Sequence, residues 1–569
     1  MNRIAALAAL SLLGCAPTFL RVKDLAGYWP LRGDCRDLSG NGNHGINHGV
    51  DLDTGTFSGR DSHVEVPPSA SLDFGAGDFT LSAWVRTDRD IDDALGDVLG
   101  KFDPSRRKGF TLGLHASAGG YNSQGNDRHV SFGIDDGRTG DWEDCGRPSP
   151  TSNYVSNSLT VFDGHLYAGI TDAAKEEDWC HVFRYRGGRE WEDCGRVGDQ
   201  RTRGVGPLIV HDGRLYAATW SYDWNRVTPD LAFCRVYRYA GGRKWEDCGQ
   251  PGRSRRLFGM ASYKGGLYVV GEDHGCYVHE GGQRWRACGT FPNYGHPMAV
   301  HDGKMYVGVL NPAGVHAYDG ASWTALGNPY GTEQRCNQIH ALRTYRGRLY
   351  ATTWPEGRVA RLGPDREWID CGRPGDSIEI NGLAVYNGKL YSGTIPRAEV
   401  FRYDGGRSWT SMKRFLDPAD VAFKRPEEWA RVTSLTVFSG RLFASLGSCT
   451  SSILDAPCDF RGRVYSMGAG GCVTFDRDLG AGWKHLAAVR RGNRLELHID
   501  GKLEASSSPF SSPFSSPDLD LSNAEPLRIG SGETDSFAGR IRDVRVYTRA
   551  LTPAEIARDR DSGARQGLD

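Results

Sequence analysis

The sequence of 569 residues lacks an excess of either charge, because 69 Lys and Arg residues are balanced by 70 Asp and Glu residues. Without a basic surplus or a block of like charges, the chain is not expected to bind nucleic acid or a membrane surface through its charge. It also lacks the Cys and His spacing of a zinc site, a nucleotide-binding glycine loop and a nucleophile elbow. Motifs therefore predict no catalytic residues and no metal ligands.

Long apolar runs are also missing, and the only candidate for a targeting segment is the beginning of the chain. Arg3 precedes an apolar stretch over residues 4–13, and Leu12-Leu13-Gly14-Cys15 resembles a bacterial lipobox. We expect residues 1–20 to be an export signal and linker, with Cys15 lipidated; ordinary secretion with cleavage nearby is the alternative. Both routes predict a cell-envelope or secreted protein, in agreement with the use of 14 cysteines.

A sequence motif of the form apolar-x-Val-x-x-Gly-x-Leu-Tyr occurs seven times in the middle of the chain. Its turn glycines are 38 to 52 residues apart, a period that is typical of propeller blades. Each unit offers two hairpins, which cannot bury their apolar faces alone and must stack on neighbouring units around a ring. The turn glycines are Gly164, Gly213, Gly265, Gly303, Gly347, Gly388 and Gly440.

Each unit has one Trp in its fourth strand, and such a fixed aromatic residue is more often packing between blades than a ligand platform. The first Trp strand has no partner strands of its own unit, and the last unit ends near Ser466 without a Trp strand. If the two join, they complete seven blades of four strands and bring both ends of the ring together. The residues are Trp142, Trp191, Trp245, Trp285, Trp323, Trp368 and Trp409.

The two flanks of the repeats, residues 27–135 and 473–560, alternate apolar and polar residues and are expected to form antiparallel strands. Motifs such as Gly27-Tyr28-Trp29-Pro30-Leu31 and Gly482-Trp483-Lys484-His485-Leu486 resemble, in their residues and their order along the chain, those of the laminin G-like, concanavalin A-like jelly-roll family. The resemblance implies an all-β protein: a jelly-roll sandwich with a seven-bladed β-propeller inserted between two of its strands. The predicted divisions are 21–138 and 469–561 for the jelly roll, 139–468 for the propeller and 562–569 for a C-terminal tail.

Because some members of that family bind calcium in loops, the Gly-rich loop with Asp37, Asn41 and His44 is a possible calcium site. Clusters of Asx and Gly are more often simple turns, so no metal is assigned and no other cofactor is expected.

Six cysteines are symmetric about the second turn of three successive units, and we predict three cross-strand disulfides there. The remaining cysteines number seven beyond Cys15, and their pairing is not assigned. The predicted pairs are Cys180–Cys194, Cys234–Cys248 and Cys276–Cys288; the unassigned residues are Cys35, Cys145, Cys336, Cys371, Cys449, Cys458 and Cys472.

The long connections between strands of the propeller should all lie on one face, because the tight turns share the other. These connections are rich in aromatic, acidic and basic side chains, which suit binding to sugars or peptides. The candidate ligand-binding residues are Trp179, Trp220, Trp224, Asp273, His274, His296, His340, Trp354, Glu356 and Arg397.

Three functions remain open at this point. The favoured one is an exported, lipid-anchored binding protein that recognises extracellular carbohydrate or protein and touches the membrane only through its anchor. The second is a sialidase-like glycoside hydrolase or lyase acting over the propeller channel, although no motif identifies a catalytic set. The third is an architectural scaffold at the cell surface, since both folds host unrelated activities.

Overall fold

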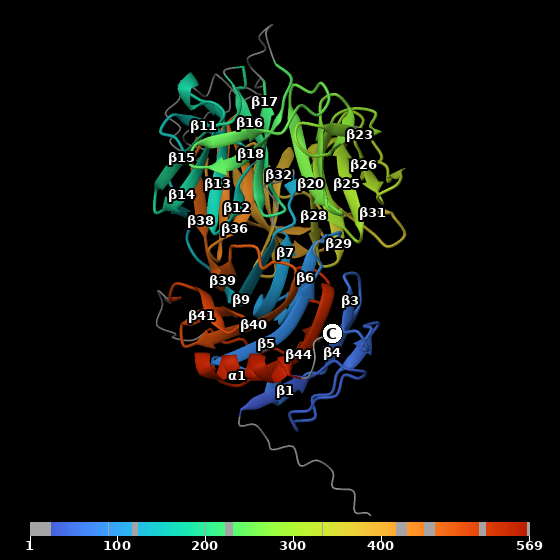
Figure 1. The fold of residues 1–569 in the computed structure, drawn as a ribbon, viewed down its shortest axis with the longest axis vertical. Helices are drawn as coiled ribbons and strands as arrows, with labels where there is room; N and C mark the ends of the chain where they lie inside the picture. Colours follow the sequence, from blue (N-terminus) through green and yellow to red (C-terminus); the bar gives the residue numbers. More distant parts are fainter. Residues whose placement is uncertain are drawn as a thin grey trace, which may run out of the picture.

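The computed structural model describes residues 24–88, 90–116, 123–156, 158–199, 201–221, 232–332, 334–416, 430–448, 461–510 and 519–565. These residues form two β domains, one above the other in Figure 1. The one α-helix within these ranges is α1 (Pro553–Ala564), which begins with the predicted capping box of Thr552 and Glu555 and extends beyond residue 561. In the same ranges, no helix has the length and apolar character needed to cross a bilayer.

The lower domain is a sandwich of two antiparallel sheets, as the jelly-roll prediction requires. Alternating side chains of both sheets form one apolar core, which includes Trp29, Phe79 and Phe132. The first sheet has the order β1 (Leu25–Trp29), β44 (Ala538–Tyr547), β5 (Phe79–Thr87), β40 (Gly482–Arg491), β41 (Arg494–Ile499) and β42 (Lys502–Ser506), with β3 (Thr56–Ser58) beside β44. The second has the order β2 (Ile46–His48), β4 (His63–Val66), β43 (Leu527–Ile529), β6 (Leu95–Asp103), β7 (Lys108–Ala116), β9 (Arg128–Thr139) and β39 (Ala469–Phe475).

The upper domain is inserted between β9 and β39, which pair antiparallel although more than three hundred residues separate them. Gly471 faces Ile134 in this pairing, and Ala469 faces Thr139. The connection of an ordinary hairpin has therefore been replaced by a whole domain whose two ends lie side by side. The predicted fold class, a jelly roll interrupted by a propeller, is confirmed.

The described residues of the insertion form seven blades of four antiparallel strands, and strands from both ends of the insertion share the last blade. In blade 1 the inner strand is in two pieces, β11 (Ser152–Val155) and β12 (Thr160–Phe162), which both pair with β13 (His165–Ala173); β14 (His181–Gly187) and β15 (Glu190–Arg196) complete the blade. Blade 2 consists of β16 (Gly204–His211), β17 (Arg214–Trp220), β18 (Val236–Gly241) and β19 (Lys244–Asp247). Blade 3 consists of β20 (Leu257–Tyr263), β21 (Gly266–Gly271), β22 (Gly275–His279) and β23 (Trp285–Thr290). Blade 4 consists of β24 (Gly295–His301), β25 (Lys304–Val309), β26 (Gly314–Tyr318) and β27 (Trp323–Ala325). Blade 5 consists of β28 (Cys336–Tyr345), β29 (Arg348–Pro355), β30 (Val359–Leu362) and β31 (Trp368–Asp370). Blade 6 consists of β32 (Glu379–Tyr386), β33 (Lys389–Ile395), β34 (Glu399–Gly405) and β35 (Ser408–Arg414). Blade 7 joins β36 (Ala430–Phe438), β37 (Arg441–Ser448) and β38 (Val464–Met467) to β10 (Glu143–Asp144).

Neighbouring blades are joined by the Trp of each outer strand, which confirms its predicted packing role. Its indole Nε1 donates to a backbone carbonyl of the preceding blade, three residues beyond that blade's own Trp. The six contacts are 2.8 to 3.0 Å long: Trp191 to Cys145, Trp245 to Cys194, Trp285 to Cys248, Trp323 to Cys288, Trp368 to Leu326 and Trp409 to Cys371.

Four blades strengthen this contact with the sequence Asp-Cys-Gly. The Asp accepts a hydrogen bond from the Gly N–H, and in three blades it pairs with an Arg two residues before the next Trp, as Asp144 does with Arg189 at 3.0 Å. The Gly lets two backbones approach closely: a Cβ on Gly195 would lie 2.4 Å from the carbonyl oxygen of Arg243. We call the hydrogen bond from the Trp indole to the carbonyl of the preceding blade the inter-blade latch; Asp-Cys-Gly reinforces it at four seams.

The seam between blades 6 and 7 lacks the latch. Trp409 of blade 6 is followed by Thr410, Ser411 and Met412 instead of Asp-Cys-Gly. Trp142 of blade 7 packs edge-on against Phe415, with ring centroids 5.2 Å apart, and its buried indole N–H has no partner among the described residues. This seam lies at the point where the chain enters and leaves the ring, so the β9–β39 pairing also holds it closed.

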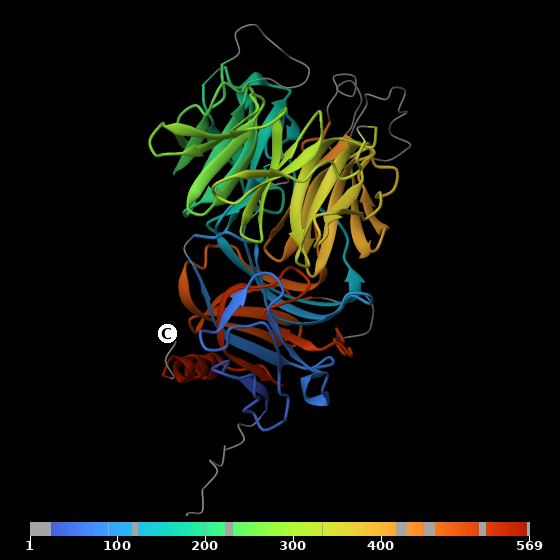
Figure 2. The same ribbon diagram turned by 90° about the vertical axis from the view of Figure 1, so that its right-hand side faces the viewer.

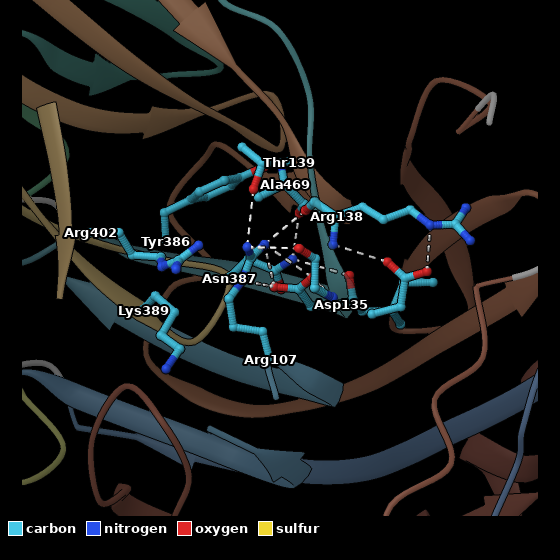
Figure 3. Close-up of polar contacts among 12 residues, drawn as sticks. Arg107, Asp135, Arg138, Thr139, Tyr386, Asn387, Lys389, Arg402 and Ala469 are labelled. Carbon is cyan, nitrogen blue, oxygen red and sulfur yellow. Dashed lines mark hydrogen bonds and ion pairs between the residues drawn. The ribbon is translucent and has the colours of Figure 1, made fainter. Parts of the chain in front are cut away.

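Figure 3 shows the polar contacts at this junction. Asn387, in the turn after β32, donates its amide to the carbonyls of Ile134 in β9 and Ala469 in β39, at 3.1 and 2.7 Å. Beside it, the buried guanidinium of Arg107 binds both oxygens of Asp135, at 3.0 and 3.2 Å. A propeller turn is therefore clamped between the two strands that carry the insertion.

The propeller contacts the jelly roll through its tight first-to-second turns, and its long connections lie at the opposite end (Figure 2). Asp90 and Cys472 of the lower domain limit the space for a side chain at Gly265 and Gly440, and Gly347 lies within van der Waals range of Asp535. The face of long connections is therefore free of the jelly roll, as the predicted division of turns and loops requires.

The jelly roll also enters the propeller channel, which the sequence did not indicate. β8 (Ser123–Gln124), between β7 and β9, pairs in parallel with the inner strand β20. The hydroxyl of Ser123 accepts from the Met260 N–H at 3.1 Å, and the amide oxygen of Gln124 accepts from the Val300 N–H at 2.9 Å. A segment of one domain thus contacts the inner strands of two blades of the other.

Two of the three predicted cysteine pairs do not face each other across their hairpins, and all six cysteines carry free thiols in the structure. Bulges shift the register, so that the carbonyl of Cys180 accepts from the Val197 N–H, about 10 Å along the strand from Cys194. Cys234 donates its N–H to the carbonyl of Ser254 and likewise does not face Cys248. Only Cys276 and Cys288 lie together, at a bulge, where a hydrogen bond from the Cys276 thiol lowers the pKa of Cys288.

The first prediction concerns the Asp-Cys-Gly reinforcement of the latch. Gly195→Ala should destabilise the protein by about 2 kcal/mol more than Gly187→Ala, because overpacking adds to the cost of a positive φ. Both glycines have a positive φ, +90° and +103°, but a Cβ at Gly187 meets nothing within 4 Å. Melting temperatures of the full chain measure the difference, and equal losses would contradict a tight approach between blades.

The second prediction concerns the thiols. Mild oxidation should link Cys276 to Cys288 and leave Cys180, Cys194 and Cys234 unlinked, because only the first pair lies within disulfide range. Peptide mapping by mass spectrometry after alkylation identifies the linked peptides. Recovery of a Cys180–Cys194 peptide from folded protein would show that the bulged register between β14 and β15 is wrong.

Candidate functional site

The candidate site begins with a repeated irregularity in the inner strands of the propeller. β16, β20, β24, β28, β32 and β36 each break register with their neighbour at the same place. Such bulges redirect a side chain and are frequent next to functional sites. The residue seven positions before the turn glycine lies in every one of these bulges: Gly206, Phe258, His296, His340, Asn381 and Thr433.

Because the inner strands run from the long connections towards the jelly roll, these bulges lie at the far end of the channel. Side chains from blades 4 to 7 meet there, together with Tyr154 of blade 1. The His296 and His340 rings are 5.0 Å apart, and His340 Nδ1 lies 3.3 Å from Glu379 Oε1. Arg431 Nη1 lies 3.6 Å from the same carboxylate oxygen and 3.3 Å from the hydroxyl of Tyr154. All five side chains are buried.

Blade 3 adds a second ion pair and, with blade 4, an aromatic wall. Arg256 binds Glu272 at 2.6 Å and lies over the ring of Phe258, 5.0 Å from its centroid. Phe258 contacts His296 at 4.7 Å between ring centroids and Tyr294 at 6.4 Å. We call these side chains together the channel mouth: Tyr154, Arg256, Phe258, Glu272, Tyr294, His296, His340, Glu379 and Arg431.

Burial determines the charge of the two imidazoles. It lowers the pKa of His340 to about 3, with a further contribution from Arg431, and holds the pKa of His296 well below its usual value. Burial raises the pKa of Glu379, which Arg431 opposes. At neutral pH each imidazole is therefore neutral and offers one donor and one acceptor. The channel mouth combines neutral hydrogen-bonding groups, two ion pairs and aromatic faces.

The predicted tryptophan platforms need correction. Trp220 is 4% exposed and donates its indole N–H to the Leu257 carbonyl at 2.7 Å, so it supports Phe258 from below. Trp179 is also buried, donates to Ala173 and lies under the guanidinium of Arg203. Trp220 ends β17 and Trp179 follows β13, and both rings are covered by other residues of the propeller, so they cannot stack on a ligand.

The other predicted residues are divided between the channel mouth and its surroundings. His296 and His340 belong to the mouth itself, while exposed His274 contacts Tyr294 at its rim, with ring centroids 5.7 Å apart. Asp273 accepts from the Tyr277 hydroxyl and from backbone N–H groups. Three predicted residues lie farther round the same face: Trp354 is half-buried, Glu356 pairs with Arg358, and Arg397 pairs with Asp376. Trp224 and Cys15 lie outside the described residues.

The possible calcium loop is a hydrogen-bonded turn. The oxygens of Asp37 accept from the N–H groups of Tyr28, Ser39 and Asn43 and from the Ser39 hydroxyl. Asn41 donates its amide to the backbone carbonyl of Leu25. These contacts favour the turn interpretation, because the groups that would have bound calcium already hold the loop together.

Sequence reasoning missed Tyr154, Arg256, Phe258, Glu379 and Arg431 of the channel mouth. Alignment of the repeats on their turn glycines gives a usable signal. Nine positions before that glycine stand Arg256, Glu379 and Arg431, two residues before the bulge on the same face of each inner strand. The repeated Val and Gly positions drew attention to the turn, while the variable positions at the other end of the same strand form the site.

Comparison with known proteins agrees with the fold. Residues 427–557 match the family model of the concanavalin A-like lectin/glucanases superfamily. No curated protein sequence gives a significant match.

Solved structures similar to this chain are propellers. Catalytically inactive virginiamycin B lyase from Staphylococcus aureus with quinupristin has 10% identity and a TM-score of 0.43, with 58% of this chain and 99% of that chain covered. YCF48 bound to D1 peptide has 16% identity and a TM-score of 0.40, with 58% of this chain and 97% of that chain covered. The WD40 propeller domain of Doa1 has 9% identity and a TM-score of 0.40, also with 58% of this chain and 97% of that chain covered.

The third prediction follows from the buried imidazoles. An unfolded chain protonates a histidine below about pH 6.5, whereas folded His340 resists protonation down to about pH 3. Stability is therefore lost as the pH falls through this window, by about 2 kcal/mol for this group at pH 5. His340→Gln should lose less stability than wild type between pH 7 and pH 5.

Chemical denaturation at the two pH values measures this difference. Glu379, with its raised pKa, stabilises the fold as the pH falls and so opposes the effect of His340. The quantity to compare is therefore the change in the free energy of unfolding between pH 7 and pH 5 in wild type and in His340→Gln. His48→Gln, at an exposed position of β2, is the matched control. An identical pH dependence in wild type and His340→Gln would contradict the burial of a neutral imidazole.

Proposed function

We propose that this protein binds an extracellular carbohydrate at the channel mouth. Its propeller and laminin G-like jelly roll are domains that suit a binding or scaffold role. The observation that carries the proposal is the convergence of aromatic rings, two Arg–Glu pairs and neutral histidines from six blades at one end of the channel.

Carbohydrate is favoured by the balance of chemical groups. Half-buried Tyr294 and exposed His274 offer ring faces at the rim for the apolar side of a sugar ring, while paired carboxylates and guanidinium groups fix hydroxyls. Because each Arg at the mouth lies beside a Glu, the site has no surplus charge that would demand an acidic or basic ligand. A neutral ligand with many hydroxyl groups fits these conditions best.

Location outside the cytoplasm is part of the proposal. It is supported by the apolar residues 4–13 after Arg3, by the lipobox-like sequence ending at Cys15 and by the jelly-roll family. Lipidation of Cys15 would hold the protein at the cell envelope, where glycans are accessible.

The fourth prediction tests the ligand class. The purified chain should bind members of a glycan array, and His274→Ala and Tyr294→Ala should each weaken binding at least tenfold through loss of a ring at the rim. Leu503→Ala, at an exposed position of the jelly roll, is the control and should bind as wild type. Equal glycan binding by all three variants would place the ligand on the jelly roll; binding of proteins alone would support a protein partner.

A second candidate function is hydrolysis or elimination at a glycosidic bond. The specific observation is the buried contact between His340 and Glu379, with Arg431 and Tyr154 on the other side of the carboxylate. A neutral imidazole beside a carboxylate can move a proton, and Arg431 can stabilise negative charge on a substrate. Turnover of fluorogenic glycosides or appearance of unsaturated products, abolished in His340→Ala, would favour this function over binding alone.

A further inference from the structure

A second cluster of chemically active side chains lies at the other end of the propeller, between the two domains. Asp93 follows β5 and Asp535 precedes β44, both in the jelly roll, while His301 ends β24 of blade 4. One carboxylate oxygen of each Asp and one ring nitrogen of His301 all lie within 4.8 Å of one another. Three segments far apart in the sequence thus bring two carboxylates and an imidazole to one point.

The buried carboxylates are only weakly compensated by cationic charge: Arg343, itself half-buried, attracts Asp535 but forms no ion pair with it. Asp93 is 4% exposed and Asp535 is 1% exposed, and neither forms an ion pair with Lys or Arg among the described residues. Two neighbouring arginines are engaged elsewhere, Arg60 with Asp302 and Arg346 with Glu533. Two adjacent buried negative charges are costly unless a proton or a cation neutralises them.

Two polar atoms of the cluster have no hydrogen-bond partner in the part of the chain that the structure describes. Asp535 Oδ2 and His301 Nδ1 are these buried atoms, whereas Asp535 Oδ1 accepts from the Ser536 N–H at 2.8 Å. Asp93 Oδ1 accepts from the N–H groups of Ala94 and Asp302, at 2.8 and 3.0 Å, which orients its other oxygen. The backbone therefore engages one oxygen of each carboxylate and leaves Asp535 Oδ2 without a hydrogen-bond partner among the described residues.

We propose that Asp93, His301 and Asp535 bind a divalent metal ion of the zinc class, which joins the propeller to the jelly roll. Imidazole nitrogen with carboxylate oxygen is a donor set that such ions accept. Tetrahedral zinc would place its ligand atoms about 3.4 Å apart, so a small contraction of the cluster suffices. Two carboxylates and one neutral imidazole balance the charge of the ion.

An approach for the ion exists. His301 and Ser536 also line a cavity of about 690 Å³ between blades 4 and 5 and the jelly roll. The fourth ligand position would face this cavity and take a water molecule, as in three-ligand zinc sites. The site can therefore exchange metal without separation of the domains.

The fifth prediction uses the full chain, freed of metal with a chelator and titrated with ZnCl2 by calorimetry. One Zn²⁺ per chain should bind at this site, and Asp93→Asn, Asp535→Asn and His301→Gln should each weaken it at least about a hundredfold. Zn²⁺ should also raise the melting temperature of the wild type, because binding favours the folded state. The two Asn variants remove repulsion between carboxylates and should melt no lower than metal-free wild type.

The control is a second cluster, His48, His63 and Glu65, which lies on the surface of the jelly roll and also groups three possible ligands. His63→Gln disrupts that cluster and should leave the interdomain Zn²⁺ site unchanged. The proposal is overturned if the three interdomain variants bind Zn²⁺ as tightly as wild type, or if only His63→Gln lowers binding. Failure of the wild type to bind Zn²⁺ also overturns it and assigns a shared proton to the carboxylates.

Discussion

The inter-blade latch is the constraint on which the architecture depends. A blade presents the indole N–H of its outer-strand Trp to a carbonyl of the preceding blade, and six of the seven seams are joined in this way. Each bond is worth only about 1 kcal/mol, but all have the same geometry and repeat around a closed ring. A contact that fixes the angle between blades at the rim also fixes the position of the inner strands at the axis.

The exceptional seam explains how a ring can be an insertion. Between blades 6 and 7 there is no Asp-Cys-Gly sequence, and the N–H of Trp142 has no partner within the described ranges. Closure there depends on β10 joining β38 and on the jelly roll, whose strands β9 and β39 hold the two ends together and bind Asn387 of blade 6. The host domain thus replaces the latch that the propeller lacks, which couples the stability of the two domains.

The sequence predicted the fold well because its signals are local or repeated. Turn glycines and outer-strand Trp residues recur at every unit, and Thr552 with Glu555 forms the helix start that its spacing indicates. Predictions that needed register failed: symmetry about Gly187 suggested that Cys180 faces Cys194, but bulges place Val197 there. The exposure of Trp179 and Trp220 was also misjudged, since sequence does not show that a neighbouring blade covers a ring at the end of a strand.

Functional chemistry in this molecule lies where the repeat varies and where the domains meet, and neither place has a motif. The bulge position holds Gly206, Phe258, His296, His340, Asn381 and Thr433 in successive blades, so each blade contributes a different group from an identical backbone. The cluster of Asp93, His301 and Asp535 arises only because turns of the ring dock on the loops of the sandwich. The repeat that makes the fold predictable therefore also places the functional residues in different units, far apart in the sequence. Only the folded structure brings these residues together.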